Sequence, residues 1–460
     1  MKRIKPLLFL LAVIGLIVLN SCLSSSVSSY SDDARVYSFS LKSDSVPAFA
    51  KATFTVNNTT DSIYNPDSLP FKTKMSRHFK AIPVISTYST SAMFFNDTTY
   101  TSGDSIDFRW KHKFKNYAAN GTTYKVYDVD VRVHKVEPDS IAWEKRSYPA
   151  YGSTETEQKV VYCNDLVMLF LNDGNNVSMY TTTDAKSWSG GSTISSLPSS
   201  TSIQNMVVLN NVIYLIGDGQ TIYSSSDGTS WTKVPISSTL QLKSLICAYN
   251  NLLFAVAYDS SNNYYVVTSP DGQTWTEQYS VNSIQSGYSN NQQFKHFPIT
   301  DFAVASFQPP TGTPKILIVG GKDQQGAVVN SVYSYMATAD NWVDLSTEIP
   351  TDSFSVRKDA ALIWYDDRNM MFGGTDENNS LVKDTILCSK TEGYLWTRND
   401  TLVKFPKALD YKLRTRATIT VDKYNRIFLI GGKTAETGGS FFREVWVGRK
   451  NKLGFGLPPL

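Results

Sequence analysis

Two arginines in the last third of the chain could form an anion-binding rim. Arg357 lies before the pair Gly373-Gly374, and Arg416 lies before the pair Gly431-Gly432 at almost the same spacing. Guanidinium groups presented together would pair with an acidic ligand. Their repetition at like positions favours a structural role, and the cationic rim is the alternative.

A long polar segment, residues 277–300, carries the remaining candidates for ligand contact. They are Tyr279, Tyr288, Phe294 and His296, with Phe297 beside them. Aromatic side chains on a solvated loop suit contact with sugars or peptides. The alternative, in which the rings fold down and pack the loop itself, stays open.

Several kinds of catalytic chemistry lack their residues. No arginine occurs between Arg146 and Arg357, which argues against a sialidase-like arginine triad spread around a ring. His296 is the only histidine after residue 139, so a galactose-oxidase-like copper site cannot be built. Hydrolase, zinc-protease and phosphate-loop motifs are absent. We expect no cofactor and no metal, and we name no catalytic residue, although a glycosidase with two distant carboxylates stays possible.

Composition excludes one class of partner and indicates one class of fold. The 460 residues include 44 basic and 41 acidic ones, so no electrostatic case for nucleic acid exists. Aromatic residues make up 13% and no long stretch has helical periodicity, which indicates an all-β protein. Cys163, Cys247 and Cys388 lack metal-ligand spacing, and we expect buried free thiols rather than one disulfide plus an orphan.

The first 22 residues combine a basic start, an apolar run and a cysteine. Lys2, Arg3 and Lys5 precede the apolar residues 7–19, and Leu19-Asn20-Ser21-Cys22 follows. The apolar run is too short for a bilayer of about 30 Å, which needs roughly 20 residues. The pattern resembles the bacterial lipobox, in which the cysteine is acylated after cleavage of the signal peptide, here residues 1–21.

This resemblance implies a lipid anchor, such as palmitate, on Cys22 and a place in the cell envelope. Residues 22–33 are serine-rich and predict a flexible tether. Leu23 stands where some inner-membrane retention signals have Asp, which favours the outer membrane. Whether the protein faces the periplasm or the cell surface stays open.

Residues 34–139 alternate between apolar and polar side chains. Tyr37, Phe39 and Leu41 alternate with polar residues, as do Tyr127, Val129, Val131 and Val133. Such a period of two buries one face of a strand. About seven short strands predict an immunoglobulin-like β-sandwich. The loop 63–70, with two prolines, is expected to be a structural connection.

Residues 140–460 contain a repeat of four strands, most copies ending in tryptophan. The repeat of roughly 40–60 residues is that of a β-propeller blade. Six apolar second strands predict six blades; they are 166–171, 212–217, 252–257, 316–320, 370–372 and 427–430. Because the last copy lacks an outer strand, we expect residues 140–147 to close the ring.

The first three blades resemble Asp-box blades, with Asp184, Asp227 and Asp271 in their turns. The last three resemble kelch blades through their glycine pairs. Together with the lipobox and the 63–70 loop, these features resemble an uncharacterised family of envelope lipoproteins from polysaccharide-utilising gut bacteria. That resemblance implies architecture and location, and it brings no catalytic residues.

We therefore expect a lipid-anchored, non-catalytic protein whose propeller binds a glycan or a protein through its loop-rich face. Two alternatives stay open: a glycan-active hydrolase or lyase with an unrecognised carboxylate pair, and a scaffold subunit of an envelope complex.

Overall fold

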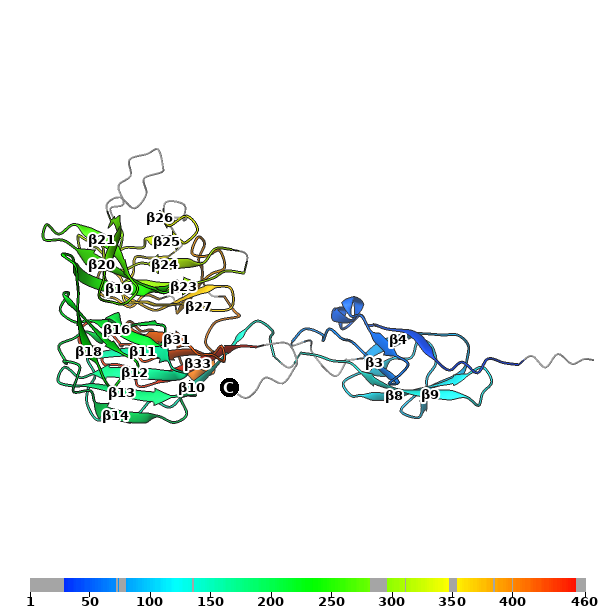
Figure 1. Ribbon diagram of the computed structural model, residues 1–460. Helices are drawn as coiled ribbons and strands as arrows, with labels where there is room; N and C mark the ends of the chain where they lie inside the picture. The colour runs from blue at the N-terminus through cyan, green and yellow to red at the C-terminus, as the bar shows by residue number, and fades with distance from the viewer. Residues whose placement is uncertain are drawn as a thin grey trace, which may run out of the picture. The chain divides into compact units, whose positions relative to one another are not determined.

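The computed structural model describes residues 29–71, 73, 80–134, 136–281, 296–310, 312–346, 354–383, 385–398 and 400–451. Two compact units divide the chain, residues 1–138 and 139–460. Both are built from β-strands, as the sequence predicts (Figure 1). No helix within the described ranges is long and apolar enough to cross a bilayer.

The first unit is a β-sandwich of a smaller and a larger sheet. The smaller sheet has the order β1 (Val36–Lys42), β4 (Lys80–Thr87), β7 (Ile106–Asp107). The larger has the order β2 (Thr55–Asn57), β3 (Ser62–Tyr64), β9 (Tyr124–Asp130), β8 (His112–Ala118), β5 (Thr90–Phe95), β6 (Thr98–Thr99). Its buried core includes Phe39, Phe108 and Phe114. The assignment to the immunoglobulin type in particular stays a prediction.

One strand of the sandwich differs from the expected alternation. Tyr37 is exposed, and Val36 takes the buried place instead. The pairing register of β1 with β4 shifts between Val36 and Ser38. Such a bulge adds a residue to one strand and moves the next side chain to the other face. Phe39, beyond the bulge, is buried as expected.

The loop 63–70 is tied down by a buried asparagine. The Asn65 side chain is fully buried; its amide donates to the Arg132 carbonyl at 2.9 Å, and its oxygen accepts from the Arg132 N–H at 2.7 Å. A buried amide with both ends satisfied holds two segments together. This geometry fits the structural connection expected from the sequence.

The second unit is a β-propeller whose described residues form six four-stranded sheets. The strands of the first three blades, from the centre outward, are β11 (Glu157–Cys163), β12 (Leu166–Asn172), β13 (Val177–Thr182), β14 (Ser189–Thr193); β15 (Val207–Leu209), β16 (Val212–Ile216), β17 (Thr221–Ser225), β18 (Thr232–Pro235); β19 (Gln241–Tyr249), β20 (Leu252–Tyr258), β21 (Tyr264–Ser269), β22 (Thr276–Ser280). Those of the last three are β23 (Ala303–Phe307), β24 (Lys315–Val319), β25 (Val332–Met336), β26 (Asn341–Asp344); β27 (Ala361–Trp364), β28 (Asn369–Phe372), β29 (Ile386–Ser389), β30 (Thr397–Arg398); β31 (Thr418–Val421), β32 (Ile427–Ile430), β33 (Val445–Lys450), β10 (Ile141–Arg146).

The outermost strand of the sixth blade comes from the start of the unit. β10 pairs antiparallel with β33 from Ile141↔Lys450 to Arg146↔Val445, and the two lie side by side in Figure 1. Trp143 of β10 is buried and donates its indole N–H to the Val403 carbonyl at 2.8 Å. The segment expected to close the ring, residues 140–147, thus contains the strand that completes the last sheet.

The turn of Asp227 shows how a short polar motif ends a blade strand. One Asp227 carboxylate oxygen accepts from the Thr229 and Ser230 amides at 2.7 and 2.8 Å. Gly228 follows with φ +77°, a conformation that favours glycine. These bonds hold the pKa of Asp227 well below its usual range. The carboxylate is occupied by the fold, as the sequence predicts for such aspartates.

Candidate functional site

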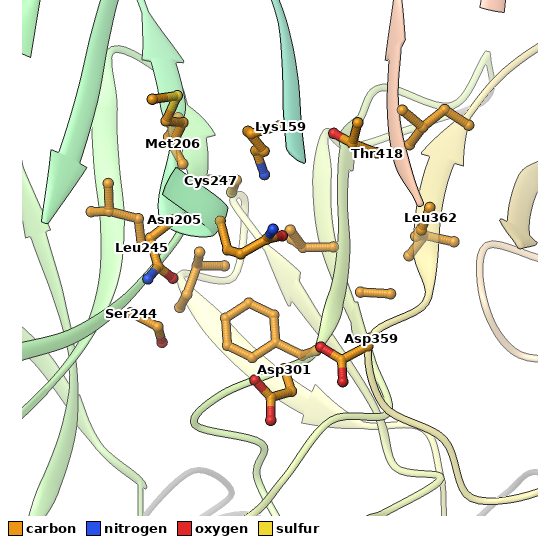
Figure 2. Close-up of a pocket in the computed structure, with 18 of the residues that line it drawn as sticks. Lys159, Asn205, Met206, Ser244, Leu245, Cys247, Asp301, Asp359, Leu362 and Thr418 are labelled. Atoms are coloured by element: carbon orange, nitrogen blue, oxygen red, sulfur yellow. The ribbon is translucent and has the colours of Figure 1, made fainter. Parts of the chain in front are cut away.

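The innermost strands of all six blades meet around a central cavity of about 470 Å³. Residues of β11, β15, β19, β23, β27 and β31 line it, together with the segments before several of these strands. Figure 2 shows Lys159, Asp301, Asp359 and Thr418 among the side chains around this space. A cavity of this size falls within the range of small-molecule sites.

Three successive blades place equivalent residues at one end of the cavity. Asp301, Asp359 and Arg416 each stand two positions before an innermost strand, with φ of 57°, 56° and 55°. The Asp359 N–H donates to the Asp301 carbonyl and the Arg416 N–H donates to the Asp359 carbonyl, both at 2.9 Å. Aspartate tolerates this left-handed conformation better than arginine does. The repeated backbone hydrogen bonds therefore hold these three residues at equivalent positions. Their different side chains give two of the positions a carboxyl group and the third a guanidinium group.

The long loops between second and third strands lie beside this end of the cavity. Short β-bridges join Thr300 to Lys322, Lys358 to Thr375, and Thr415 to Lys433. Each bridge links such a loop to the segment that precedes an innermost strand. The loop-rich face and the mouth of the cavity are therefore one region of the propeller.

Asp359 is the most perturbed acid at this mouth. Its side chain is 9% exposed, and one carboxylate oxygen has no hydrogen-bond partner among the described residues. Burial raises the pKa of Asp359 to about 7; Arg416 opposes the rise, and the negative charges of Asp301 and Glu436 add to it. The carboxyl group therefore titrates near neutral pH.

The other charges at the mouth are paired. Asp301 accepts from the Lys322 ammonium at 2.9 Å. Arg416 donates to the Glu436 carboxylate at 2.7 Å and approaches Asp359 at 3.5 Å. A guanidinium that already grips a carboxylate has less capacity left for a ligand.

Two lysines line the cavity on other blades. Lys159 on β11 points into the space in Figure 2. Lys243 on β19 also lines the cavity; it is exposed and stands where the register of β19 with β20 shifts. Lys159 is half-buried, and burial lowers its pKa to about 8. Glu157, on the same strand, is already bound: its carboxylate accepts from the Ser202 hydroxyl at 2.7 Å and the Ile203 N–H at 2.8 Å.

Of the two arginines singled out in the sequence, the structure brings only Arg416 to the cavity. Arg357 is 1% exposed and lies over the Phe354 ring at 5.5 Å. Its structural equivalent is Arg414, because a Cβ added to Gly320 would meet the Arg357 carbonyl in the same way as one added to Gly373 would meet the Arg414 carbonyl. The sequence analysis treated Arg357 and Arg416 as equivalent positions of successive blades. This match was wrong by two residues, because Arg357 corresponds to Arg414. Burial of its guanidinium beside backbone carbonyls assigns Arg357 to the fold rather than to a rim.

The aromatic candidates are dispersed. Tyr279 lies within strand β22, half-buried, and burial together with nearby Asp340 raises its pKa to about 12. The His296 side chain is 62% exposed, and its Nδ1 contacts the buried Asp323 carboxylate at 2.9 Å. Phe297 is buried in the core between blades. Tyr288 and Phe294 lie outside the described residues, as does Cys22.

The sequence analysis missed Lys159, Lys243, Asp301 and Asp359. A lysine in a first strand that continues as an apolar run was the available signal for the lysines. The two aspartates have no local motif, and only the superposition of blades makes them equivalent. Cys163, Cys247 and Cys388 are buried free thiols.

No group of three or more His, Cys, Asp or Glu side chains in the described ranges is placed to hold a metal ion. The cavity therefore presents carboxyl, ammonium and guanidinium groups together with apolar strand surface. Such an arrangement can bind a polar ligand by hydrogen bonds and charge, and its two mouth carboxyls could take part in proton transfer.

Comparisons with known proteins agree with the two-unit architecture. The family model described as the DUF6242 beta propeller domain matches residues 137–458, and that described as the domain of unknown function (DUF6242) N-terminal domain matches residues 26–131. No curated protein matches the chain in sequence. The solved structure titled "Structure of YjhT" aligns with 65% of this chain and 96% of that chain, at 15% identity and a TM-score of 0.46. Since the propeller model spans most of the chain and the second model spans the sandwich, this protein belongs to the DUF6242 family.

Proposed function

We propose that this protein is a lipid-anchored envelope protein whose propeller binds a small polar ligand, such as part of a glycan, in its central cavity. The cavity of about 470 Å³ carries the proposal, because charged side chains of several blades converge on it from a rigid ring of strands. Rigid elements that hold convergent polar groups are the usual basis of a binding site.

The lipid anchor is supported by the sequence around Cys22. Replacing Cys22 with alanine should abolish labelling by a palmitate analogue and release the protein from the membrane fraction. A variant that remains labelled would exclude this anchor. Fractionation of the wild-type protein between inner and outer membranes tests the outer-membrane assignment, which is supported by Leu23.

Ligand binding is tested with a soluble fragment that begins at residue 29. On a glycan array, the fragment should retain a defined set of sugars, and Arg416→Met should weaken that binding. Lys233→Met is the matched control, because Lys233 lies on the outer strand β18 and does not line the cavity. Equal retention by all three proteins would refute a site in the cavity. Capture of an envelope protein without any bound sugar would favour the scaffold alternative.

A second candidate, a glycan-active hydrolase, is favoured by one observation. Two carboxyl groups from successive blades, Asp301 and Asp359, meet at the cavity mouth in different environments. Asp359 titrates near pH 7, while Asp301 is ion-paired with Lys322. Glycosidases use one protonated and one ionised carboxyl group. Turnover in a hydrolysis screen that is lost in both Asp359→Asn and Asp301→Asn would replace the binding role with this one.

A further inference from the structure

Two lysines that line the central cavity, Lys159 and Lys243, have no acidic partner among the described residues. The Lys159 ammonium makes no hydrogen bond or ion pair with any described residue, and the same is true of Lys243. Both line the cavity from an innermost strand, but Lys159 is half-buried in the regular part of β11, whereas Lys243 is exposed and stands where the register of β19 shifts. Burial is the only cause acting on the pKa of Lys159, so no carboxylate is near enough to influence it.

Most of the remaining titratable residues of the cavity lining already have partners, and only Asp359 keeps a carboxylate oxygen without a hydrogen bond among the described residues; these residues are Glu157, Cys247, Asp301, Asp359 and Arg416. Glu157 accepts two hydrogen bonds from Ser202 and Ile203. Asp301 pairs with Lys322 and Arg416 pairs with Glu436. Burial raises the pKa of the Cys247 thiol, which keeps it neutral. Among the lining residues, three cations (Lys159, Lys243 and Arg416) face the carboxylates of Glu157 and Asp301, so the lining carries a small positive excess where Asp359 is protonated, below about pH 7.

An ammonium group that is desolvated without a partner opposes folding. Strongly perturbed ionisable groups in a cavity are typical of functional sites. A ligand that brings a negative charge into the cavity would supply the missing partner for Lys159. Methionine, glutamine or threonine at this position would avoid the cost of desolvation, so the lysine is best explained by what it binds.

We propose that the central cavity binds a small ligand that carries an anionic group, a carboxylate, sulfate ester or phosphate, and that Lys159 together with Lys243 holds this group. The inference rests on the proposed ligand-binding cavity and adds the chemical class of the ligand. The uncharged part of the ligand would lie toward the mouth, where Asp359 and Arg416 offer hydrogen bonds.

Calorimetric titration with paired probes tests the proposal. The probes are galacturonate against galactose, glucose 6-sulfate against glucose, and glucose 6-phosphate against glucose, so that the three arms distinguish the source of the charge. We expect at least one anionic probe to bind 10-fold or more tightly than its neutral counterpart. Lys159→Met should lower that affinity at least 10-fold, and Lys233→Met should leave it unchanged.

Two further readouts separate a binding role from a structural one. Without ligand, Lys159→Met should melt no lower than the wild type, because the variant removes a desolvated charge. In the wild type, the affinity for the anionic probe should fall as the pH rises through about 8, where Lys159 loses its proton.

The inference is overturned if no anionic probe binds better than its neutral counterpart, or if Lys159→Met binds as the wild type does. Failure of the proposed function looks different. If a neutral sugar binds the wild type but not Arg416→Met, and no anionic probe binds better, the cavity is still the binding site. The ligand would then not need an anionic group. Absence of every ligand from both the array and the titration would remove both.

Discussion

Replacing Lys159 with methionine should stabilise the propeller at neutral pH, and the gain should disappear in alkaline solution. Burial lowers the pKa of Lys159 from its ordinary 10.5 to about 8. The folded state therefore binds fewer protons than the unfolded state between these two values, and stability rises with pH across that interval. Methionine has a similar length and carries no charge, so this contribution is absent from the variant.

The magnitude follows from the two pKa values. At pH 7 both states are protonated, and keeping the charge in the folded protein costs roughly 3 kcal/mol. At pH 9 the cost is about 2 kcal/mol, and at pH 10 it is under about 1 kcal/mol. For a unit of this size, the difference between variant and wild type at pH 7 corresponds to a rise in Tm of roughly 5 °C.

Thermal unfolding followed by tryptophan fluorescence at pH 7, 9 and 10 measures the effect. The signal reports mainly on the propeller, because Trp110 is the only one of nine tryptophans before residue 139. The difference in Tm between variant and wild type at pH 10 reports mainly on changes in packing. The additional difference in Tm at pH 7 reports on the charge of Lys159. A constant difference across the pH range would refute the reasoning, since it would show that the lysine keeps its ordinary pKa.

Three other predictions concern the mouth and the closure of the ring. Asp359→Asn should raise the Tm at pH 7 and have a much smaller effect at pH 4. The pKa of Asp359 is raised to about 7 in the folded protein. The aspartate therefore stabilises the fold below about pH 4 and loses this contribution as the pH rises to 7. Gly373→Ala should cost at least about 3 kcal/mol, since the new Cβ would overlap with the backbone carbonyl oxygen of Arg414. Gly438→Ala, which also has a positive φ but open space around it, should cost only about 1 kcal/mol in denaturant unfolding, and equal losses would contradict the packing argument. A fragment that begins at residue 148 should unfold at a lower denaturant concentration than one that begins at residue 139, because it lacks β10 and exposes β33; equal midpoints would show that β10 does not close the ring.

The blades could be predicted from the sequence because their signals are local. Apolar second strands, tight polar turns and recurrent tryptophans repeat with the period of one blade, and each lies within a few residues of its neighbours. All six expected second strands correspond to β12, β16, β20, β24, β28 and β32, within one or two residues at their ends. The exposed Tyr37 was not predictable in this way, because a bulge changes the facing of a strand without changing its composition.

The sequence by itself determined the all-β class, the propeller repeat and the residues that hold its turns. Only the tertiary structure decided which charged residues share a cavity. Lys159, Asp301, Asp359 and Arg416 come from four different blades, and their proximity depends on the ring, since each innermost strand contributes only a few residues to the wall. The pKa values of Lys159 and Asp359 are set by the burial that this ring imposes, and no pattern along the chain encodes that burial.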